Sequence, residues 1–176
     1  VIIDHIKSRD GVSIDNVSRA LGRAADNGVG ILVIQPTHMM DGREYHNLLR
    51  EAEAASASFS QLAVGCPLLT AEEDFQAVIR AVAEDTAAYN DGQTAICLMG
   101  HGTEAASNQV YGRLQDRLRE AGYSHYYVGT VEASPSLENV LAEVRQGRYT
   151  RILLQPLMIV AGDHANNDMA GDGEES

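Results

Sequence analysis

The chain has few basic residues, few cysteines and no tryptophan, and the first two shortages narrow the classes of protein it can belong to. Its 176 residues include 13 Lys and Arg against 25 Asp and Glu, a formal net charge of −12, which argues against nucleic acid and anionic membranes as partners. No apolar run approaches the roughly 20 residues that cross a bilayer, so no membrane span is predicted. The two cysteines, Cys66 and Cys97, match no zinc spacing, and both are expected to be small buried residues in or beside strands.

The rest of the composition is typical of a globular protein. Hydrophobic residues make up 44% of the chain and charged residues 22%, enough for one good-sized core or two small cores that share an interface. The first residue is Val1 and not Met, so the sequence does not show whether another segment precedes it. We therefore expect a cytoplasmic protein, with a periplasmic location not excluded.

The hydrophobic pattern alternates helices with strands along the chain. Strands are predicted over 30–36, 62–64, 94–99, 125–131 and 151–157. Helices are predicted over 15–27, 43–57, 105–121 and 135–146, the last opened by Ser134-Pro135, and a capping box of Thr70 and Glu73 opens a further helix that carries Phe75 and Val82. Residues 1–8 are ambiguous. This alternation predicts an α/β fold with parallel strands flanked by helices.

An internal repeat divides the chain into two halves. The segment from Gln155-Pro156 to His164 matches, without a gap, the segment from Gln35-Pro36 to Glu44, and a strand-like run precedes each copy. We therefore expect two related α/β lobes, residues 1–90 and 91–176, with a cleft between them. The two Gln-Pro strands should superpose, which would place Glu44 and His164 on the same rim of the cleft.

Three polar residues follow strands that are expected to be central. His101 follows the strand 94–99, Glu132 follows 125–131, and His164 follows the last strand. Because the carboxyl ends of parallel strands meet at one edge of a sheet, two imidazoles and a carboxylate are expected to converge there. Nitrogen and oxygen ligands without thiolate suit Co²⁺, Ni²⁺, Fe²⁺ or Zn²⁺, and three protein ligands leave positions open for exchange.

Each of these residues also has a plain structural interpretation. His101 fits an ordinary loop histidine, Glu132 a surface carboxylate, and His164 a helix cap or a solvent-facing side chain. The same set also fits a non-haem Fe(II) oxygenase triad, although the sequence has no His-x-Asp or His-x-Glu pair of the kind typical of such triads. A third interpretation is a carrier that binds a metal or a tetrapyrrole without converting it.

Several motifs resemble one enzyme family. Leu98-Met99-Gly100-His101-Gly102-Thr103, the pair Val131-Glu132, and the run from Gly162 to Asp172, which includes His164, are similar to the anaerobic sirohydrochlorin cobaltochelatases, class II chelatases of the CbiK type. The segment from Val33 to His38, followed by Gly42, Glu44 and Tyr45, resembles the same family. The resemblance covers nearly the whole chain, and its most specific part is the run from His164 to Asp172.

This resemblance implies a function and a set of ligands. Members insert Co²⁺ into sirohydrochlorin during anaerobic cobalamin synthesis, without ATP or a redox cofactor, between two lobes related by pseudo-twofold symmetry. The family implies metal ligands at His101, Glu132 and His164, the same three positions reached from the strand ends. We expect His101 to accept ring protons as well as bind metal, because an imidazole exchanges protons near neutral pH. The types of ligand do not distinguish Co²⁺ from Ni²⁺ or Fe²⁺. The sequence also does not decide whether the protein forms a homo-oligomer.

The substrate cleft is expected to involve residues beside these ligands. Gly100 and Gly102 would let a planar ligand approach the chain closely. His38 occupies the repeat position of Met158 and either faces the cleft or is a hydrogen-bonded core histidine. The other expected cleft residues are Met39, Met40, Glu44 and Met158, and Arg43 and Arg50 are candidates to pair with substrate carboxylates.

Both ends depart from the family pattern. Members are expected to begin with a strand and a loop like those at 94–103 and to continue beyond the acidic residues near Ser176 into a closing helix. The chain is therefore expected to be part of a larger protein. Because the missing strand would pair on both sides, we expect residues 1–176 alone to be less stable and to bind metal more weakly than a complete protein.

Overall fold

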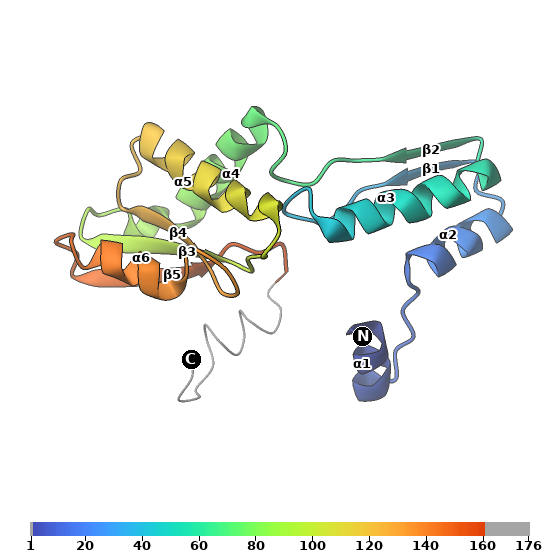
Figure 1. Ribbon diagram of the computed structural model, residues 1–176, viewed down its shortest axis with the longest axis horizontal. Coiled ribbons are helices and arrows are strands. Elements are labelled where there is room, and N and C mark those ends of the chain that lie inside the picture. The colour runs from blue at the N-terminus through green and yellow to red at the C-terminus, as the bar shows by residue number, and fades with distance from the viewer. Residues whose placement is uncertain (1, 161–176) are drawn as a thin grey trace. The chain divides into compact units, whose positions relative to one another are not determined.

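The computed structural model describes residues 2–160 and has an α/β fold with two small parallel sheets flanked by helices (Figure 1). These residues divide into two compact units at the boundary between Pro67 and Leu68. The predicted α/β class with parallel strands is confirmed. Helix α4 belongs to the second unit, and the predicted boundary between duplicated halves at residue 90 stays a prediction.

The first unit is built around a two-stranded sheet. Its elements are α1 (Ile2–Asp10), α2 (Val17–Asp26), β1 (Ile31–Ile34), α3 (Arg43–Ala55), the 3-10 turn η1 (Ser56–Ser58) and β2 (Gln61–Val64). Strands β1 and β2 pair in parallel from Ile31 opposite Gln61 to Ile34 opposite Val64. Helix α3 connects the two strands and packs against α2 and β2 (Figure 1). The buried residues of α3 are Tyr45, Leu48 and Ala52, which are spaced three and four residues apart and so form its inner face.

The second unit contains a three-stranded parallel sheet in the order β4-β3-β5. Its elements are α4 (Glu72–Asp85), η2 (Ala87–Tyr89), β3 (Thr94–Gly100), η3 (Ala106–Asn108), α5 (Gln109–Glu120), β4 (Tyr126–Thr130), α6 (Leu137–Val144) and β5 (Arg151–Pro156). Every residue of β3 is buried, as expected for a central parallel strand covered on both faces. One face of this strand, with Ala95 and Cys97, packs against Val140 and Val144 of α6.

A side chain protects the outer edge of β4. Gln115 of α5 accepts the backbone N–H of Val128 at 2.7 Å and donates to the carbonyl of Tyr126 at 3.0 Å. Its amide therefore takes the place of a neighbouring strand for two backbone groups that an edge strand leaves unpaired. Further along the same strand, the N–H of Thr130 donates to the carbonyl of Pro135 at 2.7 Å.

The helices α2, α4, α5 and α6 each start later than predicted. At α4 the cap is Ala71 and not Thr70, and the carboxylate of Asp74, in place of Glu73, accepts the N–H groups of Ala71 at 2.6 Å and Thr70 at 3.2 Å. The first turn is one residue later than expected, so the shorter Asp74 side chain reaches back to the cap.

The last helix also starts later than predicted. The cap of α6 is Ser136, whose Oγ accepts from the N–H of Asn139, and Pro135 precedes the helix. Pro135 cannot begin the helix because its carbonyl accepts from both the N–H and the hydroxyl of Thr130 in β4. The loop after β4 is therefore tied back to the strand before the helix begins.

Two further expectations are resolved by the structure. The ambiguous N-terminal segment is the helix α1, and Cys97 is fully buried, as predicted. The expectation that Cys66 is buried is wrong, because β2 ends at Val64 and Cys66 lies exposed in the loop beyond it. Among the described residues no helix is long and apolar enough to cross a membrane.

Candidate metal and tetrapyrrole site

The candidate site is at the carboxyl edge of the second sheet. His101 follows the last residue of β3, and Glu132 lies two residues beyond the end of β4. These strands are neighbours in parallel register, with Gly100 opposite Thr130, so both loops leave the sheet at the same edge. The sequence predicted this convergence from the strand ends alone.

The two side chains lie close together. The Nδ1 atom of His101 is 3.5 Å from Oε2 of Glu132, and each side chain is about half exposed, at 54% and 52%. The backbones are joined as well, since the N–H of Glu132 donates to the carbonyl of His101 at 2.9 Å. Nδ1 of His101 also lies 3.0 Å from the carbonyl of Gly102. An imidazole nitrogen and a carboxylate oxygen are donor types that a divalent metal accepts, so this pair is a candidate for part of a metal site.

The third predicted ligand, His164, lies outside the described residues. Within residues 2–160, no group of three or more His, Cys, Asp and Glu side chains is arranged to hold a metal ion. The described structure therefore brings together two of the three predicted ligands, and the position of His164 stays a prediction.

Both glycines beside His101 have a structural role. A Cβ atom on Gly100 would lie 2.2 Å from the ring of Tyr111, and one on Gly102 would lie 2.8 Å from Cβ of Thr130. Gly102 also has a φ of +86°, which residues with a side chain rarely adopt. Protein atoms thus account for both glycines, and their predicted contact with a planar ligand stays a prediction.

Two side chains that the sequence interpretation missed support the same loops. Asn108 accepts the N–H of Thr103 at 3.0 Å and donates to the carbonyl of Ser134 at 2.7 Å, so it joins the loop after β3 to the loop after β4. The N–H of Gly102 donates to the hydroxyl of Tyr111 at 3.4 Å. The only sequence signal for either residue was an Asn near the start of a helix, a common capping position.

The remaining predicted cleft residues fall into two groups. Met158 lies half-buried just after β5. His38, Met39 and Met40 are half-buried in the loop between β1 and α3, in the first unit, and Glu44 is exposed in the first turn of α3. Their contacts with a substrate stay predictions.

The environment of His38 is aromatic and partly closed. Its ring lies edge-on to Tyr45, with centroids 6.3 Å apart. Its Nδ1 atom is buried and has no hydrogen-bond partner in the described part of the chain. Burial raises the pKa of the Tyr45 phenol, and its hydroxyl donates to the carbonyl of Gly65 at 3.2 Å. Among the described residues, Nδ1 of His38 therefore does not make the hydrogen bond that a core histidine was expected to make.

Comparison with known proteins identifies the family. The family model described as cobalt chelatase (CbiK) matches residues 1–176. The chain belongs to the cobalt chelatase (CbiK) family. The resemblance stated from the sequence motifs is confirmed.

Two curated relatives of this family are similar along most of the chain. It is 33% identical over 176 residues to the sirohydrochlorin cobaltochelatase of Salmonella typhimurium, covering 100% of this chain and 66% of that protein. It is 32% identical over 164 residues to the sirohydrochlorin cobaltochelatase CbiKC of Nitratidesulfovibrio vulgaris, covering 92% of this chain and 58% of that protein. The chain therefore spans less than two thirds of the length of these two cobalt chelatases.

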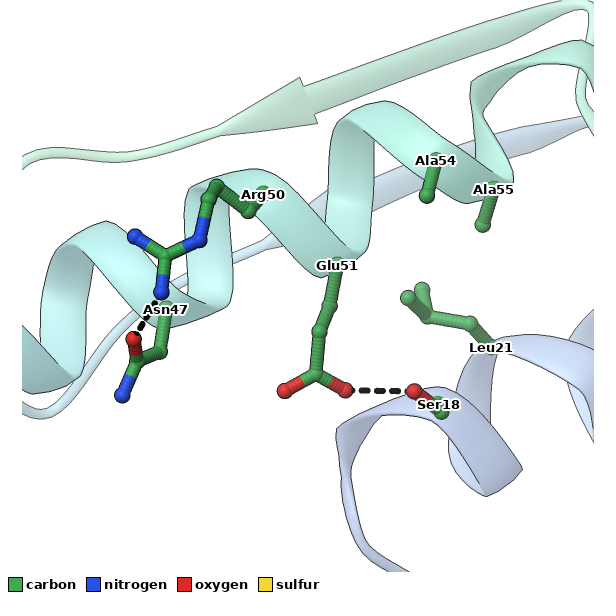
Figure 2. A pocket seen from close by; sticks show the side chains of 7 residues that line it. All are labelled: Ser18, Leu21, Asn47, Arg50, Glu51, Ala54 and Ala55. Atoms are coloured by element: carbon green, nitrogen blue, oxygen red, sulfur yellow. Dashed lines mark hydrogen bonds between the residues drawn. The ribbon is translucent and has the colours of Figure 1, made fainter.

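Arg43 and Arg50, the two candidates to pair with substrate carboxylates, each lie beside an acceptor within the protein. In this member of the cobalt chelatase family, Arg43 is 3.6 Å from the carboxylate of Glu44, its neighbour in sequence. Arg50 lies along a groove of about 440 Å³ between α2 and α3, where it donates to the side chain of Asn47 (Figure 2). In the same groove Ser18 donates to Glu51 at 2.6 Å. Both guanidinium groups thus have acceptors within the protein.

Proposed function

We propose that this protein inserts Co²⁺ into sirohydrochlorin, without ATP or a redox cofactor, as a step of anaerobic cobalamin synthesis. The observation that carries the proposal is the pair His101 and Glu132, 3.5 Å apart beyond adjacent parallel strands, in a chain that belongs to the cobalt chelatase family. The named functions of the two relatives support the choice of substrate.

The proposed reaction exchanges two protons for one metal ion. The ring loses the protons of two pyrrole N–H groups, and its four nitrogens bind Co²⁺, so that Co²⁺ and the free ring give the metallated ring and two H⁺. A site for this exchange needs a proton acceptor near the ring nitrogens and donors that hold the metal on the same side. His101 is assigned as proton acceptor and metal ligand, with Glu132 and His164 holding the incoming ion.

The exposure of His101 and Glu132 supports this assignment. Half-exposed donors release a metal more readily than a closed cage, and a metal that is a substrate must leave the protein ligands for the ring. Glu132 supplies a hard oxygen and His101 a borderline nitrogen, a combination that holds Co²⁺ without the very tight binding of thiolates.

The proposal includes a contact of the first half of the chain with the tetrapyrrole, through His38, Met39, Met40 and Glu44. The support for this part is the repeat of Gln35-Pro36 in Gln155-Pro156, each at or just after the end of a parallel strand.

An anaerobic absorption assay tests the proposal. Sirohydrochlorin is mixed with Co²⁺, Ni²⁺ or Fe²⁺ in the presence of the protein, and the change in the ring spectrum is followed. We expect metallation with Co²⁺ to be fastest, and replacement of His101 by Ala to slow it by about 10²-fold or more, because a general base contributes at least that much. Binding of ring and metal without turnover would instead indicate a carrier.

A further inference from the structure

The loops that carry His101 and Glu132 are supported by one face of the helical segment that follows β3. Asn108 is the last residue of η3, and Tyr111 is in the first turn of α5. A separation of three residues places both side chains on the same side of a helical segment. Tyr111 contacts Gly102, and Asn108 contacts Thr103 and Ser134, so the two side chains hold different residues of the loops.

Tyr111, in α5, packs against the loop after β3. Its side chain is 1% exposed, and its ring occupies the space that a side chain on Gly100 would need. The N–H of Gly102, the residue after His101, donates to the hydroxyl of Tyr111 at 3.4 Å. The hydroxyl therefore holds the loop at the residue next to His101.

Asn108 joins the two loops to each other. Its side-chain oxygen holds Thr103, two residues after His101, and its side-chain nitrogen holds Ser134, two residues after Glu132. One amide group thus fixes the distance between the segments that carry the candidate ligands. A third link runs directly between the loops, from the N–H of Glu132 to the carbonyl of His101.

We infer that Asn108 and Tyr111 are positioning residues for metal insertion, which set the separation and orientation of the His101 and Glu132 side chains. This inference rests on the chelatase function proposed above. Neither residue is assigned a contact with metal or ring. They act through the loops, so their loss should lower the rate of insertion more than the affinity for the ring.

The sharpest test removes single polar atoms. Tyr111→Phe keeps the ring that fills the space beside Gly100 and removes only the hydroxyl. Asn108→Asp keeps an oxygen for Thr103 and removes the donor to Ser134, while Asn108→Ala removes both. Matched controls are Tyr89→Phe and Asn90→Asp, which alter exposed residues of the same types away from the loops.

Three measurements on the intact protein are compared. These are kcat and KM for sirohydrochlorin with Co²⁺, the dissociation constant of Co²⁺ from its visible spectrum, and amide hydrogen exchange in residues 100–104 and 131–136. We expect Tyr111→Phe and Asn108→Ala each to lower kcat by about tenfold, as a lost hydrogen bond and a small displacement of a ligand would, with KM for the ring nearly unchanged. Both should weaken Co²⁺ binding. Asn108→Ala should speed exchange in both loops and Tyr111→Phe in residues 100–104, while Asn108→Asp should affect the segment around Ser134 more than that around Thr103.

The outcomes separate this inference from the proposed function. If the protein metallates the ring and His101→Ala abolishes that activity, while Tyr111→Phe and Asn108→Ala behave like the controls, the positioning role is overturned and the function stands. If neither the protein nor its His101→Ala variant changes the ring spectrum or binds Co²⁺, the proposed function fails. In that case the hydrogen-exchange comparison still decides whether the two residues hold the loops, and exchange equal to the controls would overturn that as well.

Discussion

The carboxylate of Glu132 lies 3.5 Å from the imidazole of His101, and the backbone of the same Glu132 donates to the carbonyl of the same His101. Because they share one ion in the proposed site, their contributions to Co²⁺ binding should not be independent. We expect the double variant His101→Ala with Glu132→Ala to bind Co²⁺ more tightly than the sum of the single losses predicts, by about 0.5–3 kcal/mol. Titration calorimetry measures this difference, and His5→Ala, at an exposed histidine of α1, is the control. Strictly additive losses would mean that the two residues do not bind the same ion.

Replacement of Gly102 by Ala should destabilise the protein and impair the site together. The positive φ and the contacts with Thr130 and Ala133 leave no room for a Cβ atom. We expect a loss of about 2 kcal/mol or more in unfolding free energy. Gly112→Ala, in α5 where a Cβ meets nothing within 4 Å, should instead be neutral or stabilising by up to about 1 kcal/mol. Chemical denaturation of the two variants makes the comparison, and equal stabilities would contradict it.

Loss of the Gln115 side chain should expose the edge of β4. In Gln115→Ala the N–H of Val128 and the carbonyl of Tyr126 lose their partners. An unsatisfied buried polar group costs about 1–3 kcal/mol, so the unfolding free energy should fall by about that much. Gln109→Ala, at an exposed position of the same helix, should change it little. A matching change in the two variants would show that water replaces the amide at no cost.

Asp91 should make stability depend on pH in the acid range. A hydrogen bond from the backbone N–H of Gln93, together with the guanidinium of Arg151, lowers the pKa of this carboxyl from 3.8 to about 2. A depressed pKa stabilises the fold above the unfolded value near 3.8, and the stabilisation is lost as pH falls from there toward 2. We expect Asp91→Asn to lower the thermal midpoint at pH 7 and to approach the wild type near pH 2. A constant gap across that range would exclude the linkage.

The two cysteines should differ in reactivity. Burial raises the pKa of the Cys97 thiol to about 11, and its side chain is inaccessible, whereas Cys66 is exposed. Because thiolate is the reacting form, a thiol reagent at pH 8 should label one cysteine per native chain rapidly and the second only after unfolding. Cys66→Ser should remove the rapid phase. Rapid labelling of Cys97 would mean that β3 is not a central buried strand.

The strands and helices that depend on local hydrophobic patterns could be predicted from the sequence. The strand preceding His101 and the strand preceding Glu132 both have the hydrophobic pattern of parallel strands, so the convergence of these two residues followed from topology alone. The start of α4 was misplaced because capping depends on which carboxylate reaches back, and Glu73 and Asp74 are equally plausible by type. A helix boundary of this kind is decided by one turn of backbone geometry.

Long-range contacts could not be read from the pattern. Asn108 holds a residue 26 positions away, and no local signal names Ser134 as its partner. Tyr111 has the ordinary spacing of a core residue, and its contact with Gly102 appears only after the helix packs on the sheet. Cys66 was misjudged because β2 ends two residues before it.

The links between the two loops do not involve the side chains of His101 and Glu132 that would bind the metal. The distance between positions 101 and 132 is set by backbone groups and by Asn108, neither of which depends on what the two side chains are. In the proposed site, exchange of His101 or Glu132 for another donor would therefore alter which metal is preferred, while the backbone that presents it stays in place. We expect such a site to acquire a new metal specificity by single substitutions, without a compensating change in the fold.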